Sequence, residues 1–177
     1  MEIEMSRNLV TRIVSCVVQM VKDEMCFMKK HNITTGYDFD SMQIERTALI
    51  LAMLICKSNT ELTTVFAKGL FYTFGPLLKE VETDDFVKDL TVSVSSYVDV
   101  ISTFDGKIDN YFSTAHSSED TDFAVNTYWR SYCKVLIFAL YDYEDNDIYN
   151  PINLLSNDER IDLCNIVLSD YNKFFVV

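Results

Sequence analysis

The chain has 177 residues, 49% of them hydrophobic and 24% charged, with only four glycines and two prolines, which indicates one folded domain and argues against disorder and a turn-rich all-β fold. Residues up to Lys79 include nine basic and eight acidic side chains, whereas those from Glu80 onward include six basic and 19 acidic ones. The acidic surface is therefore concentrated in 80–177, and we expect no nucleic acid or membrane partner, because like charges repel.

Two helices are predicted in the first third of the chain. The first covers 5–30, where apolar residues recur near helical spacing. Methionines on such a helix fill the core or line an adaptable groove, and the core interpretation is favoured. Residues 31–40 contain several turn formers and are predicted to be a loop. Asp40 or Ser41 then caps a second helix at about 41–57. This helix is apolar nearly all round, so we predict that it is the buried central element.

A capping box predicts where the next helix begins. In this motif a serine and a glutamate three residues later satisfy each other's backbone N–H groups, and Ser58 and Glu61 have that spacing. A helix is therefore predicted at about 59–74. Gly75-Pro76 ends it, because proline lacks the N–H that helical hydrogen bonding needs, and a short helical turn is expected to follow, to about Glu82.

The segment 84–103 is ambiguous between helix and strand. Apolar residues recur every three or four positions from Phe86 onward, as in a helix, but several valines also alternate, as in a strand. The helix is favoured, with Thr83 as its cap. The dipeptide Asp105-Gly106 is predicted to be the turn that ends it.

Two more helices are predicted in the C-terminal part. One covers 119–141 and is followed by an acidic loop at 142–151. Ser156 and Glu159 form a second capping box, which begins the last helix at about 157–174. The expected fold class is therefore all-α, a single-domain bundle of six or seven helices over 1–177.

The five cysteines are separated along the chain. They are Cys16, Cys26, Cys56, Cys133 and Cys164. No pair is spaced as C-x-x-C, and an odd number within helices indicates free buried thiols in a reducing, cytoplasmic compartment. No secretory signal or membrane span is expected, because polar residues interrupt 9–21 and the most apolar run, 48–56, is far too short.

Few residues suggest catalysis, so we predict no enzymatic activity, no cofactor and no metal. Glycine-rich phosphate loops, nucleophile-elbow serines and zinc-ligand clusters are absent from the sequence. Cys26 and His31 are a poor nucleophile pair, because a five-residue spacing separates them on a helix and His31 is expected in a solvated loop. An alternative is a helical enzyme that holds a divalent metal through carboxylates, chosen from Asp105, Asp109, Glu119 and Asp120.

The acidic loop is the predicted partner-binding site. Tyrosine buries a large area with few rotatable bonds, and neighbouring carboxylates attract arginine and lysine. The predicted residues are Tyr141, Asp142, Tyr143, Glu144, Asp145, Asp147 and Tyr149. They indicate a non-enzymatic inhibitor, immunity or adaptor protein that occludes a basic protein partner; homo-oligomers and a viral or bacterial host-interaction role are compatible with it.

A second alternative is a helix-binding groove. Asn126, Trp129 and Arg130 precede an apolar run, and this stretch of about twenty residues resembles the groove-forming N-W-G-R motif of Bcl-2-like proteins. The sequence departs from that motif, because the glycine is absent and the spacing differs. The resemblance implies a helical bundle with an apolar groove. Such a groove would accept an amphipathic partner helix and would show as an exposed apolar patch.

Overall fold

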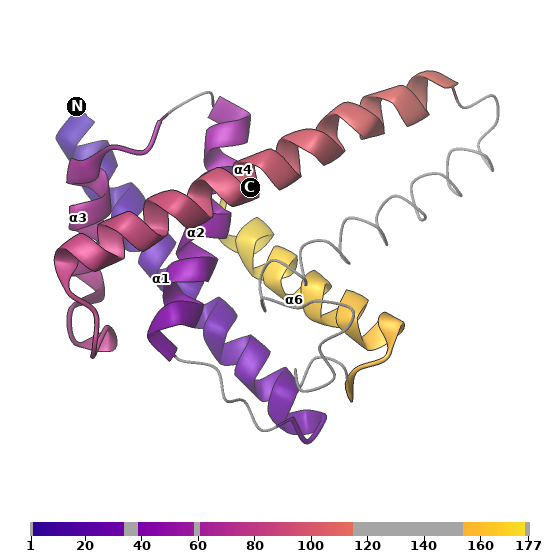
Figure 1. The fold of residues 1–177 in the computed structure, drawn as a ribbon, viewed down its shortest axis with the longest axis horizontal. Coiled ribbons are helices and arrows are strands. Elements are labelled where there is room, and N and C mark those ends of the chain that lie inside the picture. The colour runs from indigo at the N-terminus through magenta and orange to yellow at the C-terminus, as the bar shows by residue number, and fades with distance from the viewer. Residues whose placement is uncertain (1, 34–38, 59–60, 115–153, 176–177) are drawn as a thin grey trace.

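The computed structural model describes residues 2–33, 39–58, 61–114 and 154–175, and this part of the chain is all-α (Figure 1). Its helices are α1 (Glu2–Lys30), α2 (Phe39–Ser58), α3 (Thr64–Phe74), the 3-10 helix η1 (Gly75–Leu77), α4 (Thr83–Thr114) and α6 (Asn157–Phe175). The predicted all-α class is confirmed. The predicted helix at 119–141 lies outside the described residues, so the total of six or seven helices stays a prediction.

The helices pack around a pair formed by α1 and α2. Helix α1 contacts α2, α3 and α6, and α2 packs along α4. Figure 1 shows α4 crossing the bundle, with its C-terminal end projecting beyond the other described helices. Buried residues of α2 run from Asp40 to Ala52, whereas residues 53–56 are only half-buried. The core therefore includes most of α2 and the faces that the neighbouring helices turn toward it.

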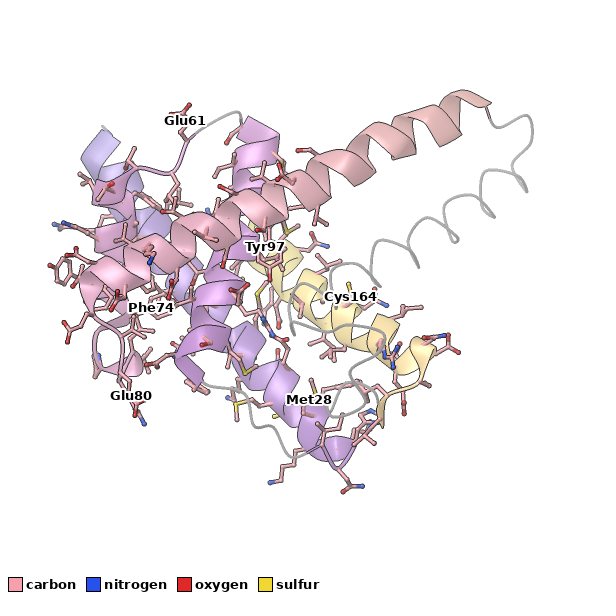
Figure 2. The ribbon with its side chains drawn as sticks, viewed as in Figure 1. Met28, Glu61, Phe74, Glu80, Tyr97 and Cys164 are labelled. Atoms are coloured by element: carbon pink, nitrogen blue, oxygen red, sulfur yellow. The ribbon has the colours of Figure 1, made fainter. Side chains whose placement is uncertain are left out.

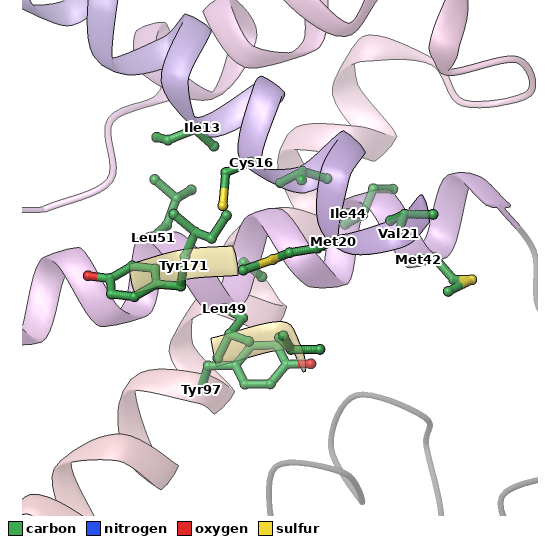
Figure 3. Close-up of a cluster of buried hydrophobic side chains, with 14 of the residues drawn as sticks. Ile13, Cys16, Met20, Val21, Met42, Ile44, Leu49, Leu51, Tyr97 and Tyr171 are labelled. Atoms are coloured by element: carbon green, nitrogen blue, oxygen red, sulfur yellow. The ribbon is translucent and has the colours of Figure 1, made fainter. Parts of the chain in front are cut away.

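Figure 3 shows part of this core, to which α1, α2, α3, α4 and α6 all contribute side chains. Ile13 and Met20 of α1, Leu49 of α2, Tyr97 of α4 and Tyr171 of α6 are each at most 2% exposed. Full burial of an aliphatic side chain of this size contributes about 1.5–3 kcal/mol. The helical spacing of apolar residues in α1 thus forms one apolar face, which packs against α2 and α6.

Asp40 does not cap α2, contrary to the prediction. Helix α2 begins at Phe39, so the alternative cap Ser41 lies within it. The buried Asp40 carboxylate accepts hydrogen bonds from the backbone N–H groups of Lys79 and Glu80, at 3.0 and 2.8 Å. These donors follow η1 and would otherwise be unpaired. Asp40 therefore fastens the connection between α3 and α4 to the start of α2.

The predicted capping box at Ser58 is wrong. Ser58 is the last residue of α2, and its hydroxyl donates to the carbonyl of Leu54 at 2.6 Å. The cap of α3 is Thr63, whose hydroxyl accepts the N–H of Phe66 at 3.2 Å. The helix predicted from 59 therefore begins at Thr64, because serine and threonine both cap well and tertiary packing selects between them.

The end of α3 follows the prediction, but the short turn after it is shorter than expected. Gly75 adopts a positive φ of 51°, and its N–H donates to the carbonyl of Phe71. Glycine tolerates this conformation because it has no Cβ. The 3-10 helix that follows stops at Leu77, before the predicted end at Glu82.

Helix α4 confirms the helical interpretation of 84–103 but runs past the predicted turn. The positions at helical spacing are buried: Phe86, Leu90, Val94, Tyr97 and Ile101. Val92 is 61% exposed, so the alternating valines do not form one buried face. The helix continues through Asp105-Gly106 to Thr114, since one glycine in a helix interior costs only about 1 kcal/mol.

The second capping box is confirmed. The N–H of Ser156 donates to Oε2 of Glu159 at 2.7 Å, and the N–H of Glu159 donates to Oγ of Ser156 at 3.2 Å. These bonds hold the pKa of the Glu159 carboxyl below its ordinary value. Helix α6 begins directly after the serine, as the motif predicts.

Candidate functional site

An apolar groove of about 850 Å³ lies between the C-terminal half of α1, the start of α2 and η1. Eight large hydrophobic side chains are exposed in the described part of the chain, and four of them line this groove. These four are Val18, Met25, Phe39 and Leu77, each 39 to 44% exposed. Because exposed apolar side chains gathered around a hollow favour binding, this groove is the candidate functional site.

Helical spacing places one wall of the groove on α1. Val18, Lys22, Met25 and Lys29 follow one another at intervals of four, three and four residues, so they form a single stripe along the helix. Buried Met28, labelled in Figure 2, also lines the groove. The sequence interpretation of the methionines as core is therefore right for Met28 and wrong for Met25.

The opposite wall is held in place by Gln43 of α2. Its Nε2 donates to the backbone carbonyl of Leu77 at 2.9 Å, which fixes η1 beside the start of α2. The side chain is 1% exposed, and its Oε1 has no hydrogen-bond partner within the described residues. A buried unpaired acceptor costs about 1–3 kcal/mol. The groove therefore has one polar group in an otherwise apolar wall.

The charged residues that line the groove are both lysines. Lys22 and Lys29 are exposed, and the described lining includes no aspartate or glutamate. The groove residues lie between 18 and 77, in the half of the chain with nearly balanced charge, although the whole protein has a net charge of −12. The described lining of the groove is thus positive, in an acidic protein.

Cys26 lies in the groove and is exposed, which corrects the prediction that the thiols are all buried. Cys16 and Cys164 are buried, and the four described cysteines are free. Burial, with a smaller contribution from the charge of Asp170, raises the pKa of the Cys16 thiol to about 12. Cys26 is accessible to alkylating reagents because it is exposed. Cys16 is protected from them because it is buried and because its raised pKa disfavours the thiolate, which is the reactive form.

A buried ion pair joins the helices that form the two walls. Nε of Arg46 donates to Oε2 of Glu24 at 2.6 Å, and Nη2 donates to Oε1 at 2.7 Å. Both side chains are 0% exposed. The guanidinium and the carboxylate therefore make two parallel bonds, a geometry that is strong and directional. This pair fixes α1 against α2 behind the groove.

A second buried cluster joins α6 to α1 and contains two carboxyl groups. The Cys16 thiol donates to the backbone carbonyl of Asp170 at 3.6 Å. Burial, followed by the neighbouring Asp23 carboxyl, raises the pKa of Asp170 from 3.8 to about 7; Glu24 adds to this shift and Lys173 opposes it. The protonation of Asp170 is therefore linked to the packing of α6 against α1.

We expect this carboxyl pair to make the fold more stable in mild acid. The folded state binds the proton more tightly than the unfolded state, so the contribution of Asp170 is complete below about pH 4 and is lost as pH rises through about 7. The substitution Asp170→Asn removes the titrating carboxyl. The difference in free energy of unfolding between variant and wild type should therefore change between about pH 4 and about pH 7. Urea unfolding at several pH values measures it, with exposed Asp162→Asn as control; equal pH profiles for wild type and Asp170→Asn would contradict the assignment.

His31 lies in the turn after α1, in agreement with the predicted loop, but it is less solvated than expected. It directly follows α1 and is half-buried, with its ring 4.3 Å from that of Phe27. Its Nδ1 lies 3.1 Å from Oε1 of Glu159, so it links the end of α1 to the start of α6. These contacts engage His31 with α6, and they do not support a nucleophile pair with Cys26.

The predicted partner-binding site, Tyr141 to Tyr149, lies outside the described residues, as do the motif residues Asn126, Trp129 and Arg130. Of the carboxylates considered for a metal, two belong to α4, namely Asp105 and Asp109, and the other two lie outside the description. Within the described ranges no group of three or more His, Cys, Asp or Glu side chains has the geometry to hold a metal ion. None of the helices described there is both long and apolar enough to cross a bilayer.

The position of this groove was not predicted from the sequence, although the sequence of α1 contains one signal for it. A stripe in which Val18 and Met25 alternate with Lys22 and Lys29 combines apolar and charged side chains on one face, beside the fully apolar face. The stripe shows that this face borders solvent. That α2 and η1 form a second wall opposite it depends on tertiary contacts.

Comparisons with known proteins place the chain in no family: no protein-family model, curated protein or solved structure matches it. The fold and the groove are therefore interpreted on physical grounds alone.

Proposed function

We propose that this protein is a non-enzymatic interaction protein that binds an amphipathic helix of a protein partner in the groove between α1 and α2. The observation that carries the proposal is the gathering of exposed Val18, Met25, Phe39 and Leu77 around one hollow. Covering them removes apolar surface from water at about 25 cal/mol per Å². The proposal takes up the groove-binding alternative from the sequence and assumes the expected bundle of six or seven helices around α2.

The dimensions of the groove wall fit a helix. The lining of α1 extends from Val18 to Lys29, which corresponds to about 18 Å at 1.5 Å per residue. A partner helix of about 12 residues lying along α1 has the same length. Its anchoring side chains would recur at three- and four-residue intervals, as in other helix-in-groove complexes. Phe39 and Leu77, on the opposite wall of the groove, would contact the other side of these anchoring side chains.

Variants in the groove test this proposal. Amphipathic helical peptides of about 16 residues are selected for binding to the full chain, and their affinities are measured for the wild type and for Met25→Glu. We expect at least tenfold weaker binding to Met25→Glu, because a carboxylate would be buried beneath the peptide. The control, Val92→Glu, changes an exposed apolar residue on α4 and should keep the affinity within about twofold, since it lies outside the groove.

Alkylation of Cys26 gives an independent reading of the same binding. This thiol lines the groove and is exposed, so a bound peptide should slow its reaction with iodoacetamide, as measured by peptide mass spectrometry. Selected peptides that keep their affinity for Met25→Glu and leave the alkylation rate of Cys26 unchanged would count against the proposal.

The acidic C-terminal half supports a second proposal. From Glu80 onward, 19 acidic side chains accompany six basic ones, and the tyrosine-rich stretch 141–149 would hold a basic protein surface by charge complementarity. To distinguish the two surfaces, host proteins are bound to the immobilised chain at low salt, and the retained proteins are tested against variants of each surface. A basic partner whose affinity falls with Tyr143→Ala but not with Met25→Glu would assign its binding to the acidic stretch.

A further inference from the structure

We infer that the partner helix is acidic along one edge and places two carboxylates, seven residues apart, against Lys22 and Lys29. The inference rests on the proposed function and deepens it, because it names the chemistry of the partner. It follows from three features of the described groove: the repeat along α1, the unshared charge of the two lysines, and the absence of acidic residues from the described lining.

The repeat along α1 sets the spacing. Val18 and Met25 are seven residues apart, and so are Lys22 and Lys29. Seven residues are close to two helical turns, about 10.5 Å along the axis. A helix packed nearly parallel to α1 meets the same alternation of apolar and positive groups at each second turn. A complementary helix therefore repeats an apolar anchor and a carboxylate every seven residues, as charged flanking positions do in coiled coils.

The two lysines are available for such a partner because the nearby carboxylates have other contacts. Glu24 is bound by Arg46, and Asp23 accepts a hydrogen bond from Gln19 at 2.9 Å. Within the described residues neither Lys22 nor Lys29 makes an ion pair. Their positive charge is therefore not neutralised by α1 itself.

The same lysines also contribute to the apolar wall. A lysine stem packs along apolar surface while its ammonium stays in water, so each chain can border the anchors of the partner and still reach a carboxylate at the rim. Ion pairs at such an exposed rim are individually weak and salt-dependent. The expected contribution is thus to partner choice and association rate, with the apolar anchors supplying most of the affinity.

The test uses two peptides and a methyl signal in the groove. Both peptides are 18-residue helices with the same leucine stripe; one has glutamates at two flanking positions seven apart, and the other has lysines there. The full chain is labelled with ¹³C at the methionine methyl groups, and the shift of the Met25 signal is followed. We expect the glutamate peptide to bind at least tenfold more tightly than the lysine peptide, with the difference shrinking at about 0.5 M salt.

Charge reversal in the protein supplies the matched control. Lys22→Glu with Lys29→Glu should invert the preference, whereas reversal of the exposed lysines Lys68 and Lys88, on α3 and α4, should leave it within about twofold. Equal shifts of Met25 by both peptides would overturn the acidic-partner inference and leave the groove function standing. If neither peptide moves the Met25 signal, the proposed function itself fails.

Discussion

Replacement of Arg46 by alanine is expected to lower the free energy of unfolding by about 3–5 kcal/mol. The substitution leaves the Glu24 carboxylate in a site where both partners are 0% exposed, without the two hydrogen bonds at 2.6 and 2.7 Å that now satisfy it. The cost comes from an uncompensated buried charge. Urea unfolding followed by circular dichroism measures this change.

The double variant Arg46→Met with Glu24→Leu is the control for this prediction. It removes both charges and keeps apolar volume between α1 and α2, so it should be far closer to wild type than Arg46→Ala. A double variant as unstable as Arg46→Ala would show that shape rather than charge dominates at this position. The two outcomes separate the ion pair from the packing that surrounds it.

Phe86→Ala is expected to destabilise the protein by about 3–5 kcal/mol through a cavity between α3 and α4. Phe86 is 0% exposed, and its ring centroid lies 5.4 Å from that of Phe71 and 6.3 Å from that of Phe74. Among the described aromatic contacts, Phe86 is the one ring that pairs with both Phe71 and Phe74. Thermal or urea unfolding provides the measurement.

Tyr72→Ala is the matched control for Phe86. Tyr72 is an aromatic residue of similar size on α3, but it is 69% exposed, so its removal should change stability by no more than about 0.5 kcal/mol. Similar losses for the two variants would contradict the packing described between α3 and α4. The comparison also concerns the groove, because α3 leads directly into η1 and thus positions Leu77.

These two sites fix the helices that form the groove. The pair Arg46–Glu24 fixes α1 against α2, and the aromatic contacts of Phe86 fix α3, which ends where η1 begins. Gln43 and Asp40 then attach η1 and the residues after it to the start of α2. A groove held in place from both sides needs little reorganisation on binding, which favours affinity.

Local patterns were sufficient for several elements. The helical spacing from Phe86 to Ile101 and the capping box at Ser156 each predicted what the structure contains, because helical periodicity and the capping hydrogen bonds involve residues only three or four positions apart. The all-α class follows from the same local information, summed along the chain.

Tertiary contacts decided where local signals competed. Ser58 and Thr63 are both good caps, and Asp105-Gly106 is a good turn, yet α3 begins after Thr63 and α4 continues through the glycine. Asp40, which looks like a cap, instead binds the N–H groups of Lys79 and Glu80, about 40 positions away. Such a partner cannot be inferred from neighbouring residues, because any unpaired N–H in the chain could satisfy the same carboxylate.

The candidate site illustrates the same division. Composition and periodicity predicted amphipathic helices and one helix that is apolar nearly all round, and a stripe such as Val18, Lys22 and Met25 already marks a face of α1 that borders solvent. Only the packing of α2 and η1 turns that stripe into a groove, by bringing Phe39 and Leu77 opposite it. A helix face is a property of residues three and four apart, whereas a groove requires surfaces from separate segments, and their relative placement depends on the buried contacts of the whole fold.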